Sequence, residues 1–155
     1  MNFISKYNFL VLIIVFLMVL SCAKKDKRSQ AEKDEAIIQQ YISDNKLNPT
    51  ATGSGLYYQI WTQGTGVQPN INNHVKVAYN GHLSNGNVFD QSQAAGVSFA
   101  LNSVIQGWQE GIPYFKKGGK GILLIPSALG YGSQAQGSIP ANTVLVFDIE
   151  LIDVQ

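Results

Sequence analysis

Few residues in this 155-residue sequence could carry acid–base, nucleophilic or metal chemistry. Its two histidines, His74 and His82, have no histidine or thiol at the spacing of a zinc site, so we predict no metal. The sequence contains no G-x-S-x-G elbow, phosphate-binding loop or dinucleotide fingerprint, and we predict no cofactor. Asp90 stands apart, because it follows Phe89 in an apolar strand close to a predicted hairpin. This pattern is typical of a binding pocket without reactive groups.

The stretch SVIQGWQEGI (103–112) combines weak helix formers with the largest apolar side chain. We predict one short helix from residue 104 to about 111, in which Gly107 and Gly111 flank Trp108. Each glycine in a helix interior costs roughly 0.5–1 kcal/mol relative to alanine. We interpret the glycines as positions where a sheet approaches the helix closely. Taken alone, Trp108 is more simply interpreted as an ordinary core residue.

Short strands must position these residues. Alternating and β-branched patterns predict the strands, and Asn-Gly within SNGN (84–87) predicts a hairpin with a two-residue type I′ turn. Only one short helix falls among the strands, so the economical architecture is one twisted antiparallel sheet wrapped on that helix, an α+β fold. The predicted strands cover residues 56–61, 75–83, 88–90, 97–101, 119–126 and 143–154.

We assign no catalytic role to the other polar residues on the predicted strands. We expect His82 to lie at the surface or in the hairpin. Asp148, Glu150 and Asp153 are expected to form a solvated face of the last strand.

A second helix is predicted before the strands. Ser29 and Glu32 have the spacing of a capping box, and apolar residues recur at helical intervals after them. We predict an N-terminal helical segment over 30–47, with the helix ending near residue 46, and then a linker over 48–55 that begins with Asn-Pro. This helix could pack on the following domain or mediate association, and a supporting role is the simpler interpretation. Its apolar face comprises Ile37, Ile38, Tyr41 and Ile42.

The N-terminus has the pattern of a bacterial lipoprotein signal. Lys6 precedes twelve unbroken apolar residues (9–20), a length that is short for a membrane span and suits a signal-peptide core. The next residues, VLSC (19–22), resemble the lipobox of bacterial lipoproteins. The resemblance implies cleavage after Ser21 and lipidation of Cys22. An ordinary signal peptide with a stray cysteine is the alternative.

Lipidation would make Cys22 a membrane anchor. The resemblance implies a diacylglycerol and an amide-linked chain, which together exceed the two-chain threshold for stable anchoring. The following residue is Ala23 and not aspartate, which by resemblance to lipoprotein sorting favours the outer membrane of the cell envelope. The predicted divisions are a signal peptide over 1–21, a lipid-anchored tether over 22–29 and the main domain over 56–155.

Composition restricts the class of protein further. The hydrophobic fraction is 45% and the charged fraction 14%, which indicates a globular domain. The formal net charge of +1 gives no electrostatic reason to expect a nucleic-acid partner. With one cysteine, the chain forms no internal disulfide. The basic residues of the tether, which we expect to be solvated, are Lys24, Lys25, Lys27 and Arg28.

Five stretches form a joint pattern that is more specific than any of them alone: GLYYQIWTQGTG (55–66), VAYNGHLSNGNVFDQS (77–92), FALNSVIQGWQEGI (99–112), GGKGILLIPSALGYG (118–132) and SIPANTVLVFDIEL (138–151). Together they resemble the FKBP-type peptidyl-prolyl cis/trans isomerases. The carrying motifs are Tyr-x-Gly-x-Leu, Val-Phe-Asp, Val-Ile-x-Gly-Trp, Tyr-Gly and Ile-Pro-x-x-x-x-Leu-Val-Phe. The resemblance covers roughly residues 55–155.

The resemblance implies a half-open antiparallel sheet wrapped around one short helix, with the N-terminal helix as an addition. It implies a pocket with Trp108 as its floor, Asp90 at its rim and a covering loop that carries Tyr131. The main-chain N–H of Ile105 and the Tyr131 hydroxyl would donate hydrogen bonds to the substrate. The implied catalytic residues are Tyr79, Phe89, Asp90, Ile105, Trp108 and Tyr131, and the implied substrate-binding residues are Phe99, Val104, Ile139 and Phe147.

The implied activity is rotation of X–Pro peptide bonds. Because prolyl isomerisation is a slow folding step, we expect the partners to be Pro-containing segments of exported proteins, together with the membrane through Cys22. We expect a monomer with no cofactor and no nucleic acid. A non-catalytic, chaperone-like binding module that uses the same pocket is the alternative, and a structural lipoprotein with a relic domain is a third.

Overall fold

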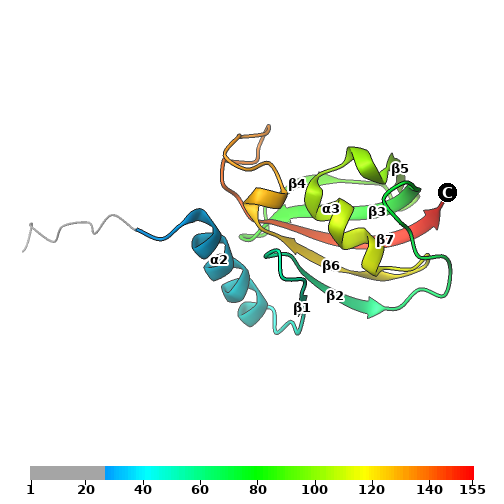
Figure 1. Ribbon diagram of the computed structural model, residues 1–155, viewed down its shortest axis with the longest axis horizontal. Helices are drawn as coiled ribbons and strands as arrows, with labels where there is room; N and C mark the ends of the chain where they lie inside the picture. The colour runs from blue at the N-terminus through cyan, green and yellow to red at the C-terminus, as the bar shows by residue number, and fades with distance from the viewer. Residues whose placement is uncertain (1–26) are drawn as a thin grey trace, which may run out of the picture.

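The structure, a computed structural model, describes residues 27–155 (Figure 1). The predicted signal peptide, Cys22 and most of the predicted tether lie outside the described residues. Within residues 27–155, no helix has the length and apolar character needed to cross a membrane. The helices are α2 (Gln30–Asp44) and α3 (Gln106–Gly111), with three single-turn 3₁₀ helices, η1 (Leu101–Ser103), η2 (Ile112–Tyr114) and η3 (Ser127–Leu129). The strands are β1 (Thr50–Ala51), β2 (Tyr57–Thr62), β3 (His74–Leu83), β4 (Val88–Gln91), β5 (Val97–Ala100), β6 (Lys120–Ile125) and β7 (Leu145–Val154).

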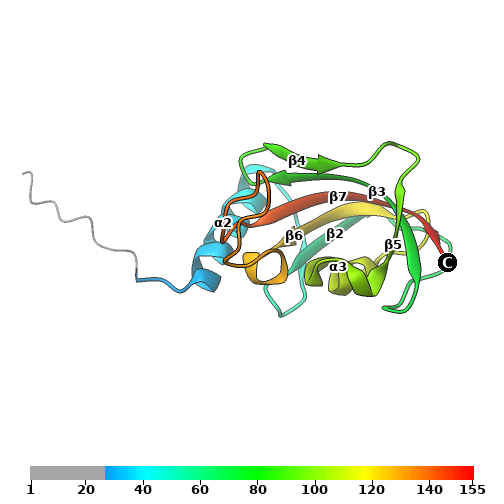
Figure 2. The ribbon, with the colours of Figure 1, turned by 90° about the horizontal axis from the view of Figure 1, so that it is seen from above.

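The described strands form one antiparallel sheet of seven strands. Its order is β1-β2-β6-β7-β3-β4, and β5 also pairs with β3. The long strand β3 has room for both partners, because residues 74–77 pair with β5 and residues 80–82 with β4. Figure 2 shows α3 on one side of the sheet. The predicted α+β fold, a twisted antiparallel sheet with one short helix and an added N-terminal helix, is confirmed.

Strand β6 is buried on both faces of the sheet. Leu123 and Ile125 belong to the core that includes α3, whereas Ile122 and Leu124 belong to a second core on the opposite face. This division follows from the alternation of side chains along a strand. The second core is covered by α2, whose Ile38 side chain is buried in it. Of the two roles considered for this helix, packing on the domain is therefore the one that the fold contains.

Helix α2 begins where the capping box predicts and ends slightly earlier than expected. The Ser29 N–H donates to Glu32 Oε2 at 2.6 Å, and the Glu32 N–H donates back to Ser29 Oγ. The helix ends at Asp44 and not near residue 46. Lys46 takes a left-handed conformation (φ 53°), and the Leu47 N–H donates to the Ile42 carbonyl. This C-terminal cap ends the helix before the Asn-Pro pair is reached.

The predicted linker contains a short strand that the sequence did not reveal. Strand β1 pairs with the start of β2, with Thr50 opposite Tyr58 and Ala51 opposite Tyr57. Two residues are too few to show a periodic pattern, so the pairing depends on the position of α2 and β2.

The hairpin after β3 forms where predicted, but the predicted type I′ turn is wrong. Such a turn needs positive φ at both central residues. Gly86 has φ 87°, whereas Lys46 and Asn142 are the only described non-glycine residues with positive φ. The Leu83 N–H donates to the Asn87 carbonyl, so the loop has three residues and only its last, Gly86, is left-handed.

His82 lies in the hairpin, where it pairs with Val88 of β4, but it is buried, so the alternative of a surface position is wrong. Helix α2 covers this part of the sheet, and the Tyr41 ring lies with its centroid 6.1 Å from that of His82. The His82 Nε2 lies 3.6 Å from Asp148 Oδ2 on the neighbouring strand. The other two acids of the predicted solvated face, Glu150 and Asp153, form exposed or half-buried ion pairs with lysines of the β6 region.

Candidate active site

Helix α3 holds Trp108 against the sheet with only 4% of its surface exposed. The two glycines permit this, as predicted, because a Cβ at Gly107 would overlap Ile125 of β6. A Cβ at Gly111 would lie 2.7 Å from Leu123 Cδ1. At these two positions the helix lies so close to β6 that a larger residue would require Ile125 or Leu123 to move.

The helix is shorter at its start than predicted. Leu101–Ser103 form the 3₁₀ turn η1, and Ile105 is extended (φ −59°, ψ 150°) before α3 begins at Gln106. The Gln109 amide donates to the Val104 carbonyl at 2.7 Å and stabilises this entry. Among residues 27–155, no hydrogen bond is formed by the main-chain N–H of Ile105. An unbonded donor thus remains at the start of the helix.

Three aromatic rings lie nearly perpendicular to the Trp108 indole. Tyr79 of β3 lies 5.2 Å from it at 85°, Phe99 of β5 lies 5.5 Å away at 87°, and Phe147 of β7 lies 5.3 Å away at 78°. Edge-to-face contacts of this kind are favourable. The planes of all three rings are steeply inclined to the indole, and none of the three is stacked parallel to it.

The Tyr79 hydroxyl is hydrogen-bonded to Asp90 of β4. It donates to Asp90 Oδ2 at 2.7 Å. Burial, followed by the hydrogen bond to Asp90, raises the pKa of Tyr79 to about 12. Tyr79 is therefore neutral under physiological conditions, and its hydroxyl proton stays in the bond to the carboxylate.

The segment between η3 and β7 contributes two further residues. Tyr131 is 37% exposed at the surface of the cluster, whereas Ile139 is buried in the core beside α3. Gln136 and Ile139 exchange two main-chain hydrogen bonds of 2.9 Å, which make a tight turn of this segment.

Two adjoining hollows result. The first has a volume of about 260 Å³ and the second about 270 Å³, and they share Asp90, Tyr131 and Phe147. Eight of the ten predicted site residues line the first hollow, while Phe89 and Ile139 line only the second. The first is lined by Tyr79, Asp90, Phe99, Ser103, Val104, Ile105, Trp108, Tyr131 and Phe147.

Sequence reasoning did not single out every residue of the two hollows. Ser103 lines the first, and Gln136 and Gly137 line the second. Ser103 directly precedes the motif Val-Ile-x-Gly-Trp, so that proximity was the one available signal. Gln136 and Gly137 lie in a polar loop whose side chains follow no periodic pattern.

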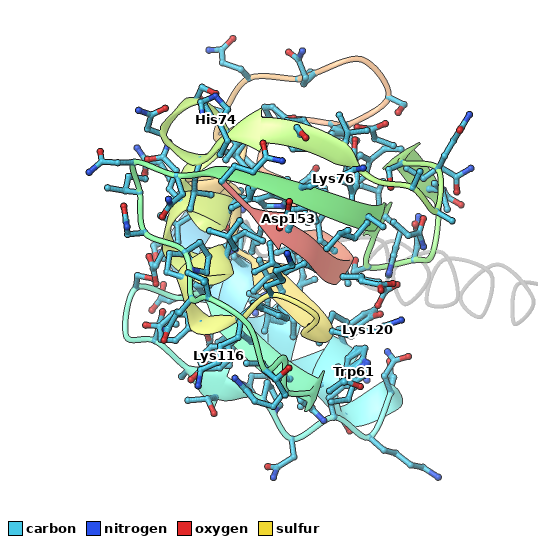
Figure 3. The ribbon with its side chains drawn as sticks, turned by 90° about the vertical axis from the view of Figure 1, so that its right-hand side faces the viewer. Trp61, His74, Lys76, Lys116, Lys120 and Asp153 are labelled. Atoms are coloured by element: carbon cyan, nitrogen blue, oxygen red, sulfur yellow. The ribbon has the colours of Figure 1, made fainter. Side chains whose placement is uncertain are left out.

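A further hollow, of about 370 Å³, lies around Trp61 on the outer sheet face and does not include Trp108. Its lining mixes Trp61 and Tyr79 with charged residues such as Lys120. Figure 3 shows Trp61 and Lys120 on this side of the molecule. Within residues 27–155, no three His, Cys, Asp or Glu side chains are grouped so that they could hold a metal ion.

Comparison with known proteins agrees with the geometry of the site. Residues 66–152 match the family model of the FKBP-type peptidyl-prolyl cis-trans isomerases. The chain is 42% identical over 140 residues to the FKBP-type peptidyl-prolyl cis-trans isomerase FkpA of Aeromonas hydrophila, with 88% of this chain and 52% of that protein covered. It is 39% identical over 134 residues to FkpA of Escherichia coli K12, with 85% and 49% covered.

Solved structures give the same result. A peptidyl-prolyl cis-trans isomerase from Pseudomonas syringae has a TM-score of 0.70 and 34% identity, covering 83% of this chain and 98% of that one. FkpA from Escherichia coli has a TM-score of 0.72 and 34% identity, covering 100% of this chain and 74% of that one. The chain belongs to the family of FKBP-type peptidyl-prolyl cis-trans isomerases. It spans about half the length of the curated relatives it matches.

Proposed function

We propose that this chain is a peptidyl-prolyl cis/trans isomerase that accelerates rotation about X–Pro bonds. The observation that carries the proposal is the first hollow, where three nearly perpendicular rings surround the almost fully buried indole of Trp108. A proline ring is apolar and compact, and it can lie against the indole without displacing another ring. The names of the relatives state the same activity for those proteins.

The physical task of the pocket is to lower a resonance barrier. An X–Pro bond isomerises unaided in about 10–100 s against a barrier of about 18–20 kcal/mol. The planar amide is more dipolar than the twisted one, so water stabilises the ground state more than the transition state. An aromatic hollow that excludes water removes this preference. A thousandfold acceleration requires about 4 kcal/mol of differential stabilisation, and desolvation with one or two oriented hydrogen bonds can supply it.

The polar groups of the hollow orient the substrate. The unbonded N–H of Ile105 is proposed to donate to one substrate carbonyl and the Tyr131 hydroxyl to another. A twisted amide has a more basic nitrogen, which can accept a hydrogen bond from the next N–H of the substrate. Since no covalent bond is made or broken, the reaction needs neither a nucleophile nor a general base.

Asp90 has two possible roles that a single substitution separates. It either stabilises the twisted carbonyl electrostatically or only orients Tyr79 through their 2.7 Å hydrogen bond. Asp90→Asn keeps an oxygen acceptor for Tyr79 and removes the charge. Unchanged turnover of this variant would leave only the orienting role.

The adjoining hollow extends the proposed substrate site. Phe89 and Ile139 offer apolar contact there, beside the polar Gln136 and Ser138. We assign it to side chains next to the proline.

The test is the prolyl isomerase activity of residues 23–155 on X–Pro peptides. Turnover should depend on Tyr131 and Phe89, so Tyr131→Phe and Phe89→Ala are measured in parallel. Clear acceleration that falls in Phe89→Ala, with the fold retained, supports an isomerase that uses this pocket. A folded protein without acceleration would contradict the proposal.

A non-catalytic binding module is the second candidate, and the unpaired donor and apolar floor of the same hollow would serve it equally well. It predicts saturable binding of Pro-containing peptides, lost in Phe89→Ala, without acceleration. Peptide binding and turnover measured on the same variants distinguish the two.

We also propose that the chain is anchored in the cell envelope, in the outer membrane, through lipidated Cys22, and that it acts as a monomer on exported proteins. The apolar run at 9–20 and the sequence VLSC (19–22) support the anchor. Mass spectrometry of the protein from a bacterial host should show the diacylglycerol and amide-linked chains on Cys22. A Cys22→Ser variant that still fractionates with the outer membrane would contradict this anchor.

A further inference from the structure

A buried carboxylate joins α2 to the segment that carries Tyr131. Asp34 lies on α2 and is 1% exposed, although none of the steps proposed above uses it. Its Oδ2 accepts a hydrogen bond from the Ser127 N–H at 2.8 Å and another from the Ser127 hydroxyl at 2.6 Å. Its Oδ1 accepts a bond of 2.7 Å from the Gln30 amide. Three donors therefore hold this carboxylate at one place in the interior.

Main-chain hydrogen bonds link Ser127 to the residues on either side of Tyr131. The Ser127 carbonyl accepts hydrogen bonds from the N–H groups of Gly130 at 3.0 Å and Gly132 at 2.8 Å. These two residues flank Tyr131 in the chain, so both of its peptide neighbours are fixed to one carbonyl. A Cβ at Gly130 would lie 2.9 Å from Leu145 Cδ1, which shows how closely this turn packs on β7.

The far end of the same segment also returns to α2. The Asn142 N–H donates to the Gly132 carbonyl at 2.7 Å, and the Asn142 carbonyl accepts a longer bond, 3.4 Å, from the Gln30 amide. Gln30 is the residue that donates to Asp34. The helix thus contacts both ends of the segment through one connected set of hydrogen bonds.

We propose that Asp34 is a positioning residue, which sets the place of Tyr131 over the pocket from outside the matched family region. That region begins at residue 66, whereas α2 lies wholly before it. The inference rests on the proposed function for its effect on turnover. The placement of Tyr131 itself is independent of activity and can be measured separately.

The geometry predicts a rank order of substitutions. Asp34→Ala leaves both Ser127 donors buried without an acceptor, which is costly. Asp34→Asn keeps an oxygen facing Ser127, and the Gln30 amide can turn its own oxygen toward the new NH₂ group at the loss of its long bond, 3.4 Å, to the Asn142 carbonyl. Ser127→Ala removes the hydroxyl bond but keeps the main-chain bond to Asp34. The displacement of Tyr131 should therefore be large for Asp34→Ala and small for Asp34→Asn and Ser127→Ala.

The first experiment measures how exposed Trp108 becomes. The chain has two tryptophans, so Trp61→Phe leaves Trp108 as the only indole fluorophore. Acrylamide quenching is recorded on the full chain in mild detergent, in this background. Asp34→Ala should raise the quenching constant with the near-UV spectrum of a folded protein retained, and Asp34→Asn should stay close to the parental value.

Glu35→Gln is the matched control, because the neighbouring Glu35 ties α2 to β2 through the Tyr57 hydroxyl (2.7 Å) and not to the Tyr131 segment. It should leave quenching unchanged. Equal quenching in Asp34→Ala and the parent would overturn the proposal, and so would equal increases in Asp34→Ala and Glu35→Gln. If Asp34→Ala does not fold, the same comparison is made with Ser127→Ala, for which a small increase supports the proposal and none overturns it.

The second experiment is a double-mutant cycle on kcat/KM with Tyr131→Ala. If Asp34 acts by placing Tyr131, Asp34→Ala lowers kcat/KM about tenfold in the parent, equivalent to about 1.4 kcal/mol, and adds nothing once Tyr131 is removed. Full additivity would overturn the proposal. If the parent accelerates no X–Pro rotation, the proposed function fails, and the quenching result alone decides whether Asp34 positions Tyr131.

Discussion

On one face of the sheet, α3 packs into a core rich in aromatic rings, whereas on the other face α2 packs on aliphatic side chains. The first core buries Trp108, Phe115 and Phe147, with further rings at its edge. The second core buries only aliphatic side chains, with Tyr41 and Tyr57 at its edge; the buried residues are Ile38, Ile122, Leu124, Val144 and Val146. Both use alternate residues of the same strands, β6 and β7.

This difference explains why the predicted site lies on only one face. Aliphatic side chains interdigitate and leave few voids. Around Trp108 three rings lie nearly perpendicular to the indole, and the first hollow opens among them. The pocket therefore forms where the side chains are rigid, and the opposite face provides support through α2.

The largest expected loss of stability comes from truncating two neighbouring leucines of β6, which are both fully buried but lie in different cores. Leu123→Ala and Leu124→Ala should each lower the free energy of unfolding by about 2–5 kcal/mol, since each leaves a cavity. Leu123 contacts α3 and Leu124 lies in the α2 core, so only Leu123→Ala should also weaken turnover. Urea unfolding and isomerase assays, corrected for the folded fraction, check this. Equal losses of turnover would remove the distinction between the faces.

The close approach of α3 is tested by Gly107→Ala. The new methyl group would overlap Ile125, so we expect a loss of about 1–3 kcal/mol despite the better helix propensity of alanine. The exposed Gln106→Ala on the same helix is the control and should stay within about 0.5 kcal/mol of the parent. Thermal or urea unfolding measures both, and a neutral or stabilising Gly107→Ala would show that the contact is relaxed easily.

Two adjacent residues of β4 distinguish the effect of the pocket ring from the effect of the strand. Phe89 contacts Phe147 with ring centroids 5.4 Å apart, whereas Val88 is 53% exposed. Phe89→Ala should lower kcat/KM by about tenfold, which corresponds to about 1.4 kcal/mol of transition-state stabilisation. Val88→Ala should leave it unchanged. A similar loss in both variants would mean that the strand, and not the ring, matters.

The smallest expected effect concerns pH on the α2 face. The Asp148 carboxylate, 3.6 Å from Nε2, raises the pKa of His82 above its usual value, against the opposing effect of burial. Because the folded pKa exceeds the unfolded one, the stabilisation is complete below the unfolded value, about 6.5, and is lost as the pH rises through the higher folded value. Asp148 is half exposed, so solvent screening keeps the contribution below about 1 kcal/mol.

Urea unfolding of the parent and of His82→Gln at about pH 5.5 and about pH 8.5 measures this contribution. The parent should lose more stability than the variant on going to the higher pH. Turnover should not follow the same profile, since Tyr79 at the pocket has a pKa of about 12 and stays neutral throughout. Identical pH dependence of stability in parent and variant would exclude His82 as its source.

Most of the fold could be predicted because its signals are local. Alternation along residues 143–154 predicts the strand β7, and the spacing of Ser29 and Glu32 predicts the start of α2. The errors arose where a neighbour in space changes the outcome. His82 has the sequence context of a surface residue, but α2 covers it.

The site was predictable in composition but not in arrangement. The family motifs name Tyr79, Trp108 and Tyr131, and the structure brings all three to one hollow. Their catalytic roles stay predictions. The division into two adjoining hollows depends on ring orientations, which follow from packing and leave no trace in spacing.

The sequence by itself determined every strand except the two-residue β1, the short helix with its two glycines, the capping box and the family, since each is recorded in the order of neighbouring residues. Only the tertiary structure decided that Asp34 meets Ser127, 93 positions further along the chain. The reason is physical, because a contact between distant segments depends on how the whole sheet places them. Neither residue has a local pattern that points to the other.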